Sequence, residues 1–194
     1  MVSVNYRWET RRLPRPPKSE LVPLAVRAAE LAGLPMDFDW ELNIRFVGDR
    51  TMAHANKEFV GHLGTTDVIT FSYFDDPGSL FPGEPAVELI ICIDAALREG
   101  AARPDSCYAR EMVLYLVHGL LHAAGEDDLS PGPRRRMRRR EAELLSSLAS
   151  SFNFLLSFPS EKKVSKEKLR TLQRRAPVPL SRRPFEGGRF LLLP

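Results

Sequence analysis

The chain has 194 residues, of which 43% are hydrophobic, so it can bury one sizeable core and is short for two full domains. No apolar run reaches the length of a membrane-spanning helix, and the first residues lack the pattern of a signal peptide, so we expect a cytoplasmic protein with no membrane partner. Only Cys92 and Cys107 are present, which excludes a four-cysteine zinc site and argues against a disulfide framework. We expect both cysteines to be reduced and buried.

The net charge of +3 is unevenly distributed along the chain. Residues 1–149 carry 18 basic and 22 acidic side chains, a net of −4, whereas residues 150–194 carry 10 and 3, a net of +7. We therefore predict a catalytic domain over residues 1–149 and a basic C-terminal extension over residues 150–194. The extension has little tendency to form a fold of its own. Such an extension is suited to a polyanionic partner, and an extension without function is an equally good interpretation.

The predicted elements alternate between strands and helices. Strands are predicted where apolar and polar residues alternate and β-branched or aromatic residues are frequent. Helices are predicted where apolar residues recur at helical spacing. In chain order we predict a strand at 2–8, a helix at 19–32, a strand at 42–47, a helix at 49–59 with Asp49 as its N-cap, a strand at 67–73, a surface loop at 75–85, a strand at 87–93, and helices at 108–124 and 134–147. This order predicts an α+β fold in which helices pack on a small mixed β-sheet.

Two histidines, His118 and His122, lie four residues apart on the most apolar predicted helix. Residues at this spacing share one helix face, so both imidazoles can reach one metal ion. Gly125 then allows the chain to turn back, which brings Asp128 toward the same ion as a third ligand. Three protein ligands leave a fourth position for water, the arrangement typical of catalytic zinc. We therefore predict one Zn²⁺ per chain, in preference to two histidines that are merely hydrogen-bonded.

The same histidine spacing occurs in zinc proteases, where a glutamate directly follows the first histidine and acts as the general base. In this chain that position is Gly119. Glycine cannot accept a proton from water. The histidine spacing therefore allows a metalloprotease as an alternative, but the absence of the general base argues against it.

The string from His118 to Asp128 resembles the signature of the YbeY endoribonuclease family, the rRNA maturation factors, which reads H-G-x-L-H-x-x-G-x-D-H. This chain has Asp128 in place of the final histidine. Further matches lie in the segment 52–71, in the predicted strand 87–92 and in the predicted closing helix. Matching residues are His118, Gly119, Leu121, His122, Gly125, Asp127, Asn56, Gly61, Thr66, Asp67, Val68, Met137, Glu141 and Leu144.

The resemblance implies a small α+β domain that holds one zinc and cleaves single-stranded RNA, with a role in 16S rRNA 3′-end maturation and ribosome quality control. Its partners would be RNA and ribosomal particles, with no DNA. His118 and His122 would be the catalytic and metal-binding residues, with Asp128 as third metal ligand. The family pattern has an arginine where this chain has Val60. That difference keeps open a second function, a non-catalytic ribosome-assembly factor that retains the metal.

Other polar residues near the motifs have two interpretations each. Thr65 and Thr66 could contact RNA or satisfy the start of a strand, and Asp127 could orient a ligand histidine or cap the turn. The Arg-rich segment 134–140 should turn most of its guanidinium groups to solvent, where they either contact phosphates or form a plain solvated face.

Overall fold

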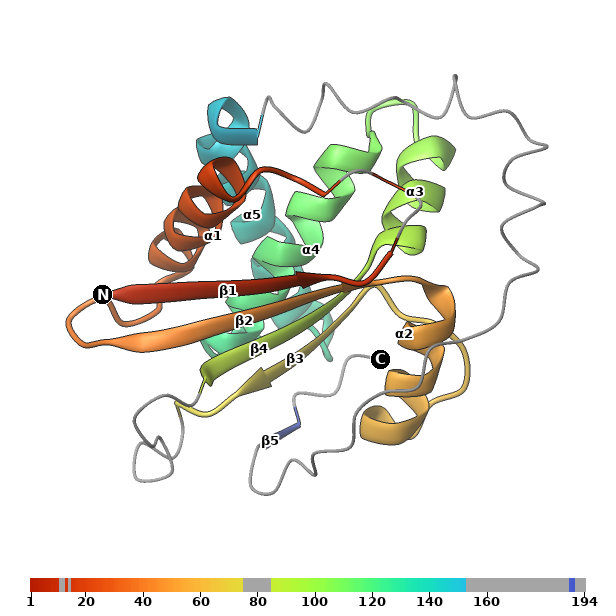
Figure 1. Cartoon of the computed structure of the whole chain (residues 1–194), viewed down its shortest axis with the longest axis horizontal. Helices are drawn as coiled ribbons and strands as arrows, with labels where there is room; N and C mark the ends of the chain where they lie inside the picture. The colour runs from red at the N-terminus through yellow and green to blue at the C-terminus, as the bar shows by residue number, and fades with distance from the viewer. Residues whose placement is uncertain (11–12, 14, 75–84, 153–188, 191–194) are drawn as a thin grey trace.

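The computed structural model describes residues 1–10, 13, 15–74, 85–152 and 189–190. The described part is an α+β fold in which helices cover a mixed β-sheet (Figure 1). The strand order is β1-β2-β4-β3-β5, with β1, β2 and β4 parallel and β3 antiparallel to both its neighbours. The strands are β1 (Val2–Trp8), β2 (Trp40–Val47), β3 (Val68–Ser72), β4 (Pro85–Cys92) and the short β5 (Arg189–Phe190).

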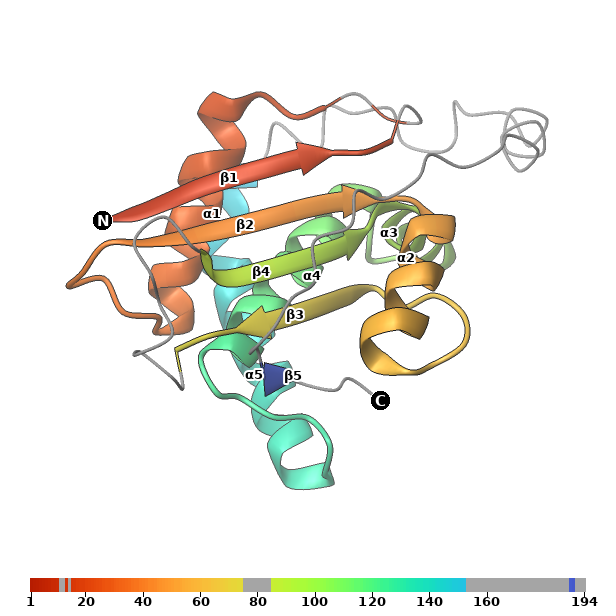
Figure 2. The ribbon, with the colours of Figure 1, turned by 60° about the horizontal axis from the view of Figure 1, so that its bottom comes forward.

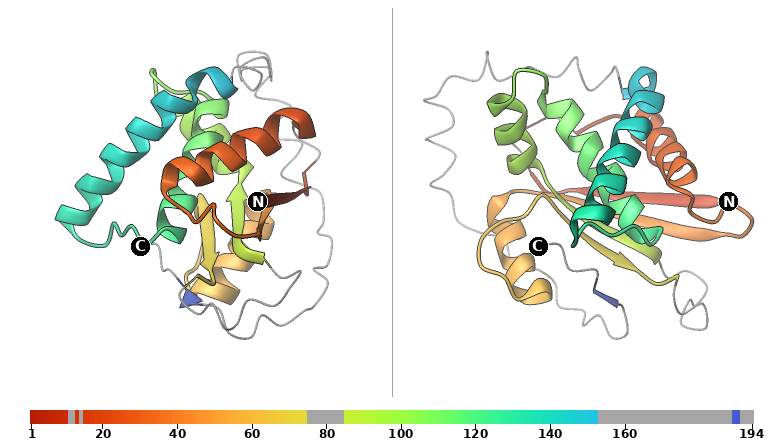
Figure 3. Two further views of the ribbon diagram at one scale, coloured as in Figure 1. Left: turned by 90° about the vertical axis from the view of Figure 1, so that its left-hand side faces the viewer. Right: turned by 180° about the vertical axis from the view of Figure 1, so that it is seen from behind.

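The helices labelled α1, α3, α4 and α5 lie on one face of the sheet, and α2 lies on the other side near its end (Figures 2 and 3). The helices are α1 (Lys18–Ala32), α2 (Asp49–Ala55) with its π-helical continuation η1 (Asn56–Val60), α3 (Ile93–Ala102), α4 (Tyr108–Ala123) and α5 (Pro131–Leu148), followed by the short 3-10 helix η3 (Ala149–Phe152). Helix α4 is the central helix, because it packs against β3, α1, α3 and α5. The side chains of this helix are therefore held by contacts on several sides.

Gly119 lets α4 lie unusually close to the sheet. A Cβ atom at this position would lie 2.8 Å from Leu89 Cδ2 on β4 and 2.9 Å from Thr70 Oγ1 on β3. The Thr70 hydroxyl lies 3.5 Å from the carbonyl oxygen of Gly119. This close approach fixes the part of α4 that carries His118 and His122, so the glycine has a packing role that the sequence alone did not show.

Most of the predicted elements are confirmed, with boundaries that differ by at most three residues. The predicted strand at 42–47 begins two residues earlier, at Trp40, and the helix predicted at 134–147 begins at Pro131. The helix begins earlier than predicted because proline fits the first turn of a helix, where its missing N–H is not needed. The predicted loop at 75–85 lies outside the described residues except for Pro85, which begins β4.

Two predictions about local structure are wrong. Asp49 is not the N-cap of its helix: Gly48 holds that position, and the backbone N–H of Asp49 donates a 2.8 Å hydrogen bond to the carboxylate of Asp94 on α3. The cap thus comes from a distant segment, which local sequence cannot reveal. Cys92 is buried as expected, but Cys107 is only half-buried, and both are free thiols.

Helix α3 was not predicted at all. It begins at Ile93, directly after the last residue of β4, so no loop separates the two elements and the apolar run of the strand continues into the helix. Among the described residues, no helix is both long enough and apolar enough to cross a membrane. Of the C-terminal extension, the structure describes 150–152 and the two residues of β5, which pair with Phe71 and Ser72 of β3.

Candidate metal centre and its cleft

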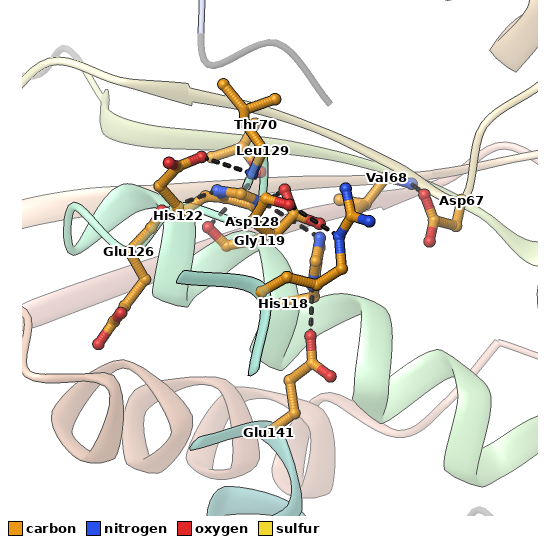
Figure 4. Close-up of polar contacts among 12 residues, drawn as sticks. Asp67, Val68, Thr70, His118, Gly119, His122, Glu126, Asp128, Leu129 and Glu141 are labelled. Atoms are coloured by element: carbon orange, nitrogen blue, oxygen red, sulfur yellow. Dashed lines mark hydrogen bonds and ion pairs between the residues drawn. The ribbon is translucent and has the colours of Figure 1, made fainter. Parts of the chain in front are cut away.

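Helix α4 places His118 and His122 side by side near its C-terminal end (Figure 4). Their Nε2 atoms are 3.1 Å apart, and their rings meet edge to face with centroids separated by 4.6 Å. His122 is 3% exposed, whereas His118 is half-buried at the wall of a cleft. The predicted sharing of one helix face is confirmed.

The chain turns back after α4 through Gly125, which has a φ of 88°. This left-handed conformation favours glycine because a side chain is strained there. The turn is closed by hydrogen bonds from Gly125 N to His122 O and from Glu126 N to Leu121 O, both 2.9 Å. It brings Asp128 back to the histidines, with Asp128 Oδ1 3.9 Å from His122 Nε2. The structure therefore brings together the three residues predicted as metal ligands.

The geometry of these three residues fits a divalent metal. One ligand atom from each of His118, His122 and Asp128 lies within 4.8 Å of the others. Two nitrogens bound to one tetrahedral zinc at about 2.0–2.1 Å would lie roughly 3.3 Å apart, close to the separation observed. Asp128 Oδ1 is buried and finds no hydrogen-bond donor among the described residues, which is costly for a carboxylate oxygen unless a cation binds it.

The outer nitrogens of both rings are held by fixed acceptors. His118 Nδ1 lies 2.5 Å from Glu141 Oε1 on α5, and His122 Nδ1 lies 3.0 Å from the backbone oxygen of Glu126. The carboxyl group of Glu141 and the backbone oxygen of Glu126 are hydrogen-bond acceptors, so each Nδ1 is placed to donate its hydrogen. The two Nε2 atoms then face each other, an arrangement that a shared metal ion would stabilise.

Burial and charge act differently on the two histidines. For His118, burial lowers the pKa, but the hydrogen bond and charge of Glu141, together with Asp67 and Asp128, outweigh it, and the net pKa is raised. For His122, burial and the neighbouring His118 lower the pKa. His122 is therefore the ring more easily kept neutral, the form in which imidazole binds metals.

The pair His118 and Asp128 lies at the wall of a polar cleft of about 700 Å³. Its walls come from the loop before β3 and from α3, α4 and α5, so it is built by segments far apart in sequence. The lining residues are Thr65, Thr66, Asp67, Ala95, Arg98, Glu99, Arg103, Glu111, Leu114, Tyr115, His118, Asp128, Arg134, Met137, Arg138 and Glu141. A cleft of this size with charged walls can accept a polar, extended ligand.

The structure resolves most of the alternatives left open for residues near the motifs. Thr65 and Thr66 do line the cleft, and the Thr66 hydroxyl also donates a 3.0 Å hydrogen bond to Asp67. Asp127 caps the turn, since its Oδ1 accepts a 2.9 Å hydrogen bond from the backbone N–H of Leu129. Glu126 is half-buried, and its Oε1 lies 4.0 Å from Arg140 Nε.

The other two histidines of the chain and Val60 do not line the cleft. His54 is exposed and pairs with Glu58 at 3.3 Å, and His62 is also exposed. Val60 ends η1 and packs half-buried against the core, so it does not line the cleft.

Several residues of the site were missed by sequence reasoning. Glu141 was noted only as part of the closing helix, although it holds His118. Asp67, Arg98 and Arg103 line the cleft because β3 and α3 meet α4 there. Asp67 had appeared only as a family match in the segment 52–71, and no local signal marks Arg98 or Arg103, since their distance from His118 along the chain is bridged only by tertiary packing.

The site gives no support to peptide hydrolysis by the usual zinc-protease route. Gly119, where those enzymes carry the general base, faces β3 and β4 and leaves no room even for a Cβ atom. A carboxylate at that position could not be accommodated without moving the helix.

Comparison with known proteins places this chain among relatives of one kind. A family model described as endoribonuclease YbeY matches residues 7–149. A protein from Anaeromyxobacter sp. named endoribonuclease YbeY is 38% identical over 121 residues, which are 62% of this chain and 61% of that protein. Another of the same name, from Rhodopirellula baltica, is 36% identical over 126 residues, 64% of this chain and 60% of that protein. The chain thus spans less than two thirds of the length of either relative.

A solution structure from Thermotoga maritima also matches, with 21% sequence identity and a TM-score of 0.46 over 77% of this chain and 93% of that one. The family match covers all four walls of the cleft and the three residues His118, His122 and Asp128. The chain therefore belongs to the endoribonuclease YbeY family.

Proposed function

We propose that this protein is a zinc-dependent endoribonuclease that cleaves single-stranded RNA, with His118, His122 and Asp128 as the metal ligands. The observation that carries the proposal is the cluster of these three residues, of which His118 and Asp128 line the charged cleft. Membership in the endoribonuclease YbeY family supports RNA as the substrate. We further propose that the substrate is 16S rRNA at its 3′ end, met on ribosomal particles in the cytoplasm.

The donor set favours zinc among the common divalent metals. Two imidazole nitrogens and one carboxylate oxygen match its preferred ligands, and three protein ligands leave one position open. A zinc ion held there supplies Lewis acidity, which stabilises negative charge on a phosphoryl oxygen and acidifies a water molecule.

The residues of the chain prepare this site in three ways. Glu141 and the backbone oxygen of Glu126 hold the two rings at their Nδ1 atoms, so that both Nε2 atoms point at one place. The arginines of the cleft wall supply positive charge for an RNA backbone, and the hydroxyls of Thr65 and Thr66 supply hydrogen bonds. The nucleophile is either water or the RNA 2′-hydroxyl group.

The direct test is an incubation of purified protein of measured zinc content with single-stranded rRNA fragments, duplex RNA and casein. We expect cleavage of the single strand, loss of that cleavage after chelation, and intact casein. The product ends identify the nucleophile, because a 2′,3′-cyclic phosphate arises only when the 2′-hydroxyl attacks.

A metal-replete protein that binds rRNA and leaves it intact would instead support the non-catalytic assembly factor. The Val60→Arg variant sharpens that comparison by restoring the family residue at a half-buried position outside the cleft wall. If neither form cleaves RNA, the endoribonuclease proposal is overturned.

Replacing Glu141 by glutamine should weaken zinc binding without removing it. The neutral amide still occupies the space beside His118 Nδ1 but no longer strengthens the imidazole through a charged hydrogen bond. Loss of such an orienting carboxylate typically lowers metal affinity about 10–100-fold. Competition with a chromophoric chelator measures the change. Glu143→Gln, an exposed position on the same helix, is the matched control and should leave the affinity unchanged.

A further inference from the structure

Helix α5 presents one stripe of residues to the cleft. Arg134, Arg138 and Glu141 all line it, and their spacing of four and three residues places them on one helix face. Glu141, at the inner end of this stripe, holds the metal-site residue His118. The two arginines lie about one and two turns before Glu141 on the same face of α5, so all three side chains belong to one wall of the cleft.

Arg134 is attached to the metal site itself. Its Nε donates a 2.9 Å hydrogen bond to the backbone oxygen of Asp128, and its side chain is half-buried. A guanidinium group has five N–H donors, so four remain for a ligand in the cleft. The hydrogen bond therefore holds the positive charge of Arg134 beside the third metal ligand. The remaining N–H groups of Arg134 can still bind an anion.

The charge of these two arginines is not neutralised locally. Within the part of the chain that the structure describes, no acidic side chain lies within ion-pairing distance of Arg134 or Arg138. The other two arginines of the cleft differ: Arg98 lies 2.5 Å from Asp49, and Arg103 lies 3.0 Å from Glu99. Arg134 and Arg138 thus form a positive strip on the α5 side of the cleft. On the α3 side, the positive charges of Arg98 and Arg103 are largely neutralised by neighbouring carboxylates.

We propose that Arg134 and Arg138 bind two successive phosphates of an RNA strand, Arg134 the phosphate next to the metal and Arg138 its neighbour. This inference rests on the proposed function for its substrate. The two residues are separated by about 6 Å along the helix axis, a step that one extended strand can match with adjacent phosphates. Arginine suits the task because its planar group donates two parallel hydrogen bonds to a phosphate.

The same helix provides the matched control. Arg135 and Arg136 carry identical charge, are exposed, and do not line the cleft. A pair of substitutions there changes the net charge of α5 by the same amount as a pair in the cleft. Any difference between the two double variants is therefore due to position rather than to total charge.

The experiment measures binding of a 2′-O-methylated single-stranded oligonucleotide to the full chain across a range of salt concentrations, with the recovered oligonucleotide checked for integrity. Each phosphate contact contributes about 0.7 to the slope of log affinity against log salt for a single strand. Arg134→Gln/Arg138→Gln should flatten the slope by about 1.4 and weaken binding tenfold or more at low salt. Arg135→Gln/Arg136→Gln should change either quantity far less.

Arg138→Gln alone keeps the test sound if Arg134→Gln disturbs the loop of Asp128. It should flatten the slope by about 0.7 and raise KM for RNA, with zinc content and kcat near those of the wild type. Equal losses in the cleft pair and the outward pair would overturn the inference, even if the wild type cleaves RNA. Wild-type protein that fails to cleave RNA, yet shows the predicted difference between the pairs, refutes the endoribonuclease proposal and supports the phosphate-binding strip.

Discussion

His122→Ala is expected to leave the protein without bound zinc and without ribonuclease activity. His122 is buried, and its Nε2 faces both His118 Nε2 and Asp128 Oδ1, so no other ligand among the described residues can take its place. Loss of a ligand should lower zinc affinity by more than the roughly 100-fold that loss of an orienting partner can cause. Removing several kcal/mol of metal stabilisation from the transition state corresponds to a rate loss of about 10³-fold or more.

Zinc per chain and the cleavage rate are the two measurements, and His62→Ala is the control because His62 is exposed and lies outside the cleft. A second comparison tests the third ligand. Asp128→Ala should lose the metal, whereas Asp127→Ala, which removes only the hydrogen bond to Leu129 N, should retain it. The opposite result would show that the carboxylate assignment is wrong. Asp128→His should keep or tighten binding, because imidazole is a good zinc ligand.

Gly100→Ala adds only one methyl group, yet we expect it to cause the largest loss of stability among the variants proposed. A Cβ atom at Gly100 would lie 2.5 Å from the backbone carbon of Cys107 and 2.5 Å from the backbone nitrogen of Tyr108. Backbone atoms cannot rotate away, so α3 would have to separate from α4. Alanine gains about 1 kcal/mol in helix propensity, but overpacking against backbone costs about 3 kcal/mol or more.

The net effect should be a decrease of about 2 kcal/mol or more in the free energy of unfolding, measured by urea denaturation. For a chain of this size that corresponds to a Tm lower by roughly 4–8 °C. Gly132→Ala is the control, because a Cβ atom there meets nothing within 4 Å and Gly132 also lies in a helix. If Gly100→Ala unfolds at the wild-type urea concentration, the tight crossing of α3 and α4 is not present in solution.

The parts of the site that could be predicted from sequence are those fixed by local geometry. His118 and His122 meet because an α-helix places residues four apart on one face, and Asp128 returns because Gly125 allows a tight turn. Both relationships involve fewer than a dozen residues. They depend on backbone conformation, which the glycine and the apolar spacing determine.

The parts that could not be predicted depend on packing between distant segments. Glu141 reaches His118 across 23 positions in the chain because α5 packs on α4, and the cap of α2 comes from Asp94 across 45 positions. The Arg-rich segment shows the same limit. Its composition indicated a basic surface, but only the placement of α5 separates Arg134 and Arg138, which line the cleft, from Arg135 and Arg136, which do not.

The metal position joins three segments that are otherwise held mainly by side-chain packing: the end of α4, the turn that carries Asp128, and α5 through Glu141. A zinc ion there would act as a cross-link, because a ligand that binds only the folded chain stabilises it in proportion to the logarithm of its concentration. Under the proposed function, one ion would both take part in catalysis and determine how often α5 detaches. Zinc supply would thereby control the lifetime of the protein as well as its activity, since a detached α5 exposes Met137, Leu144 and Leu145 to proteases.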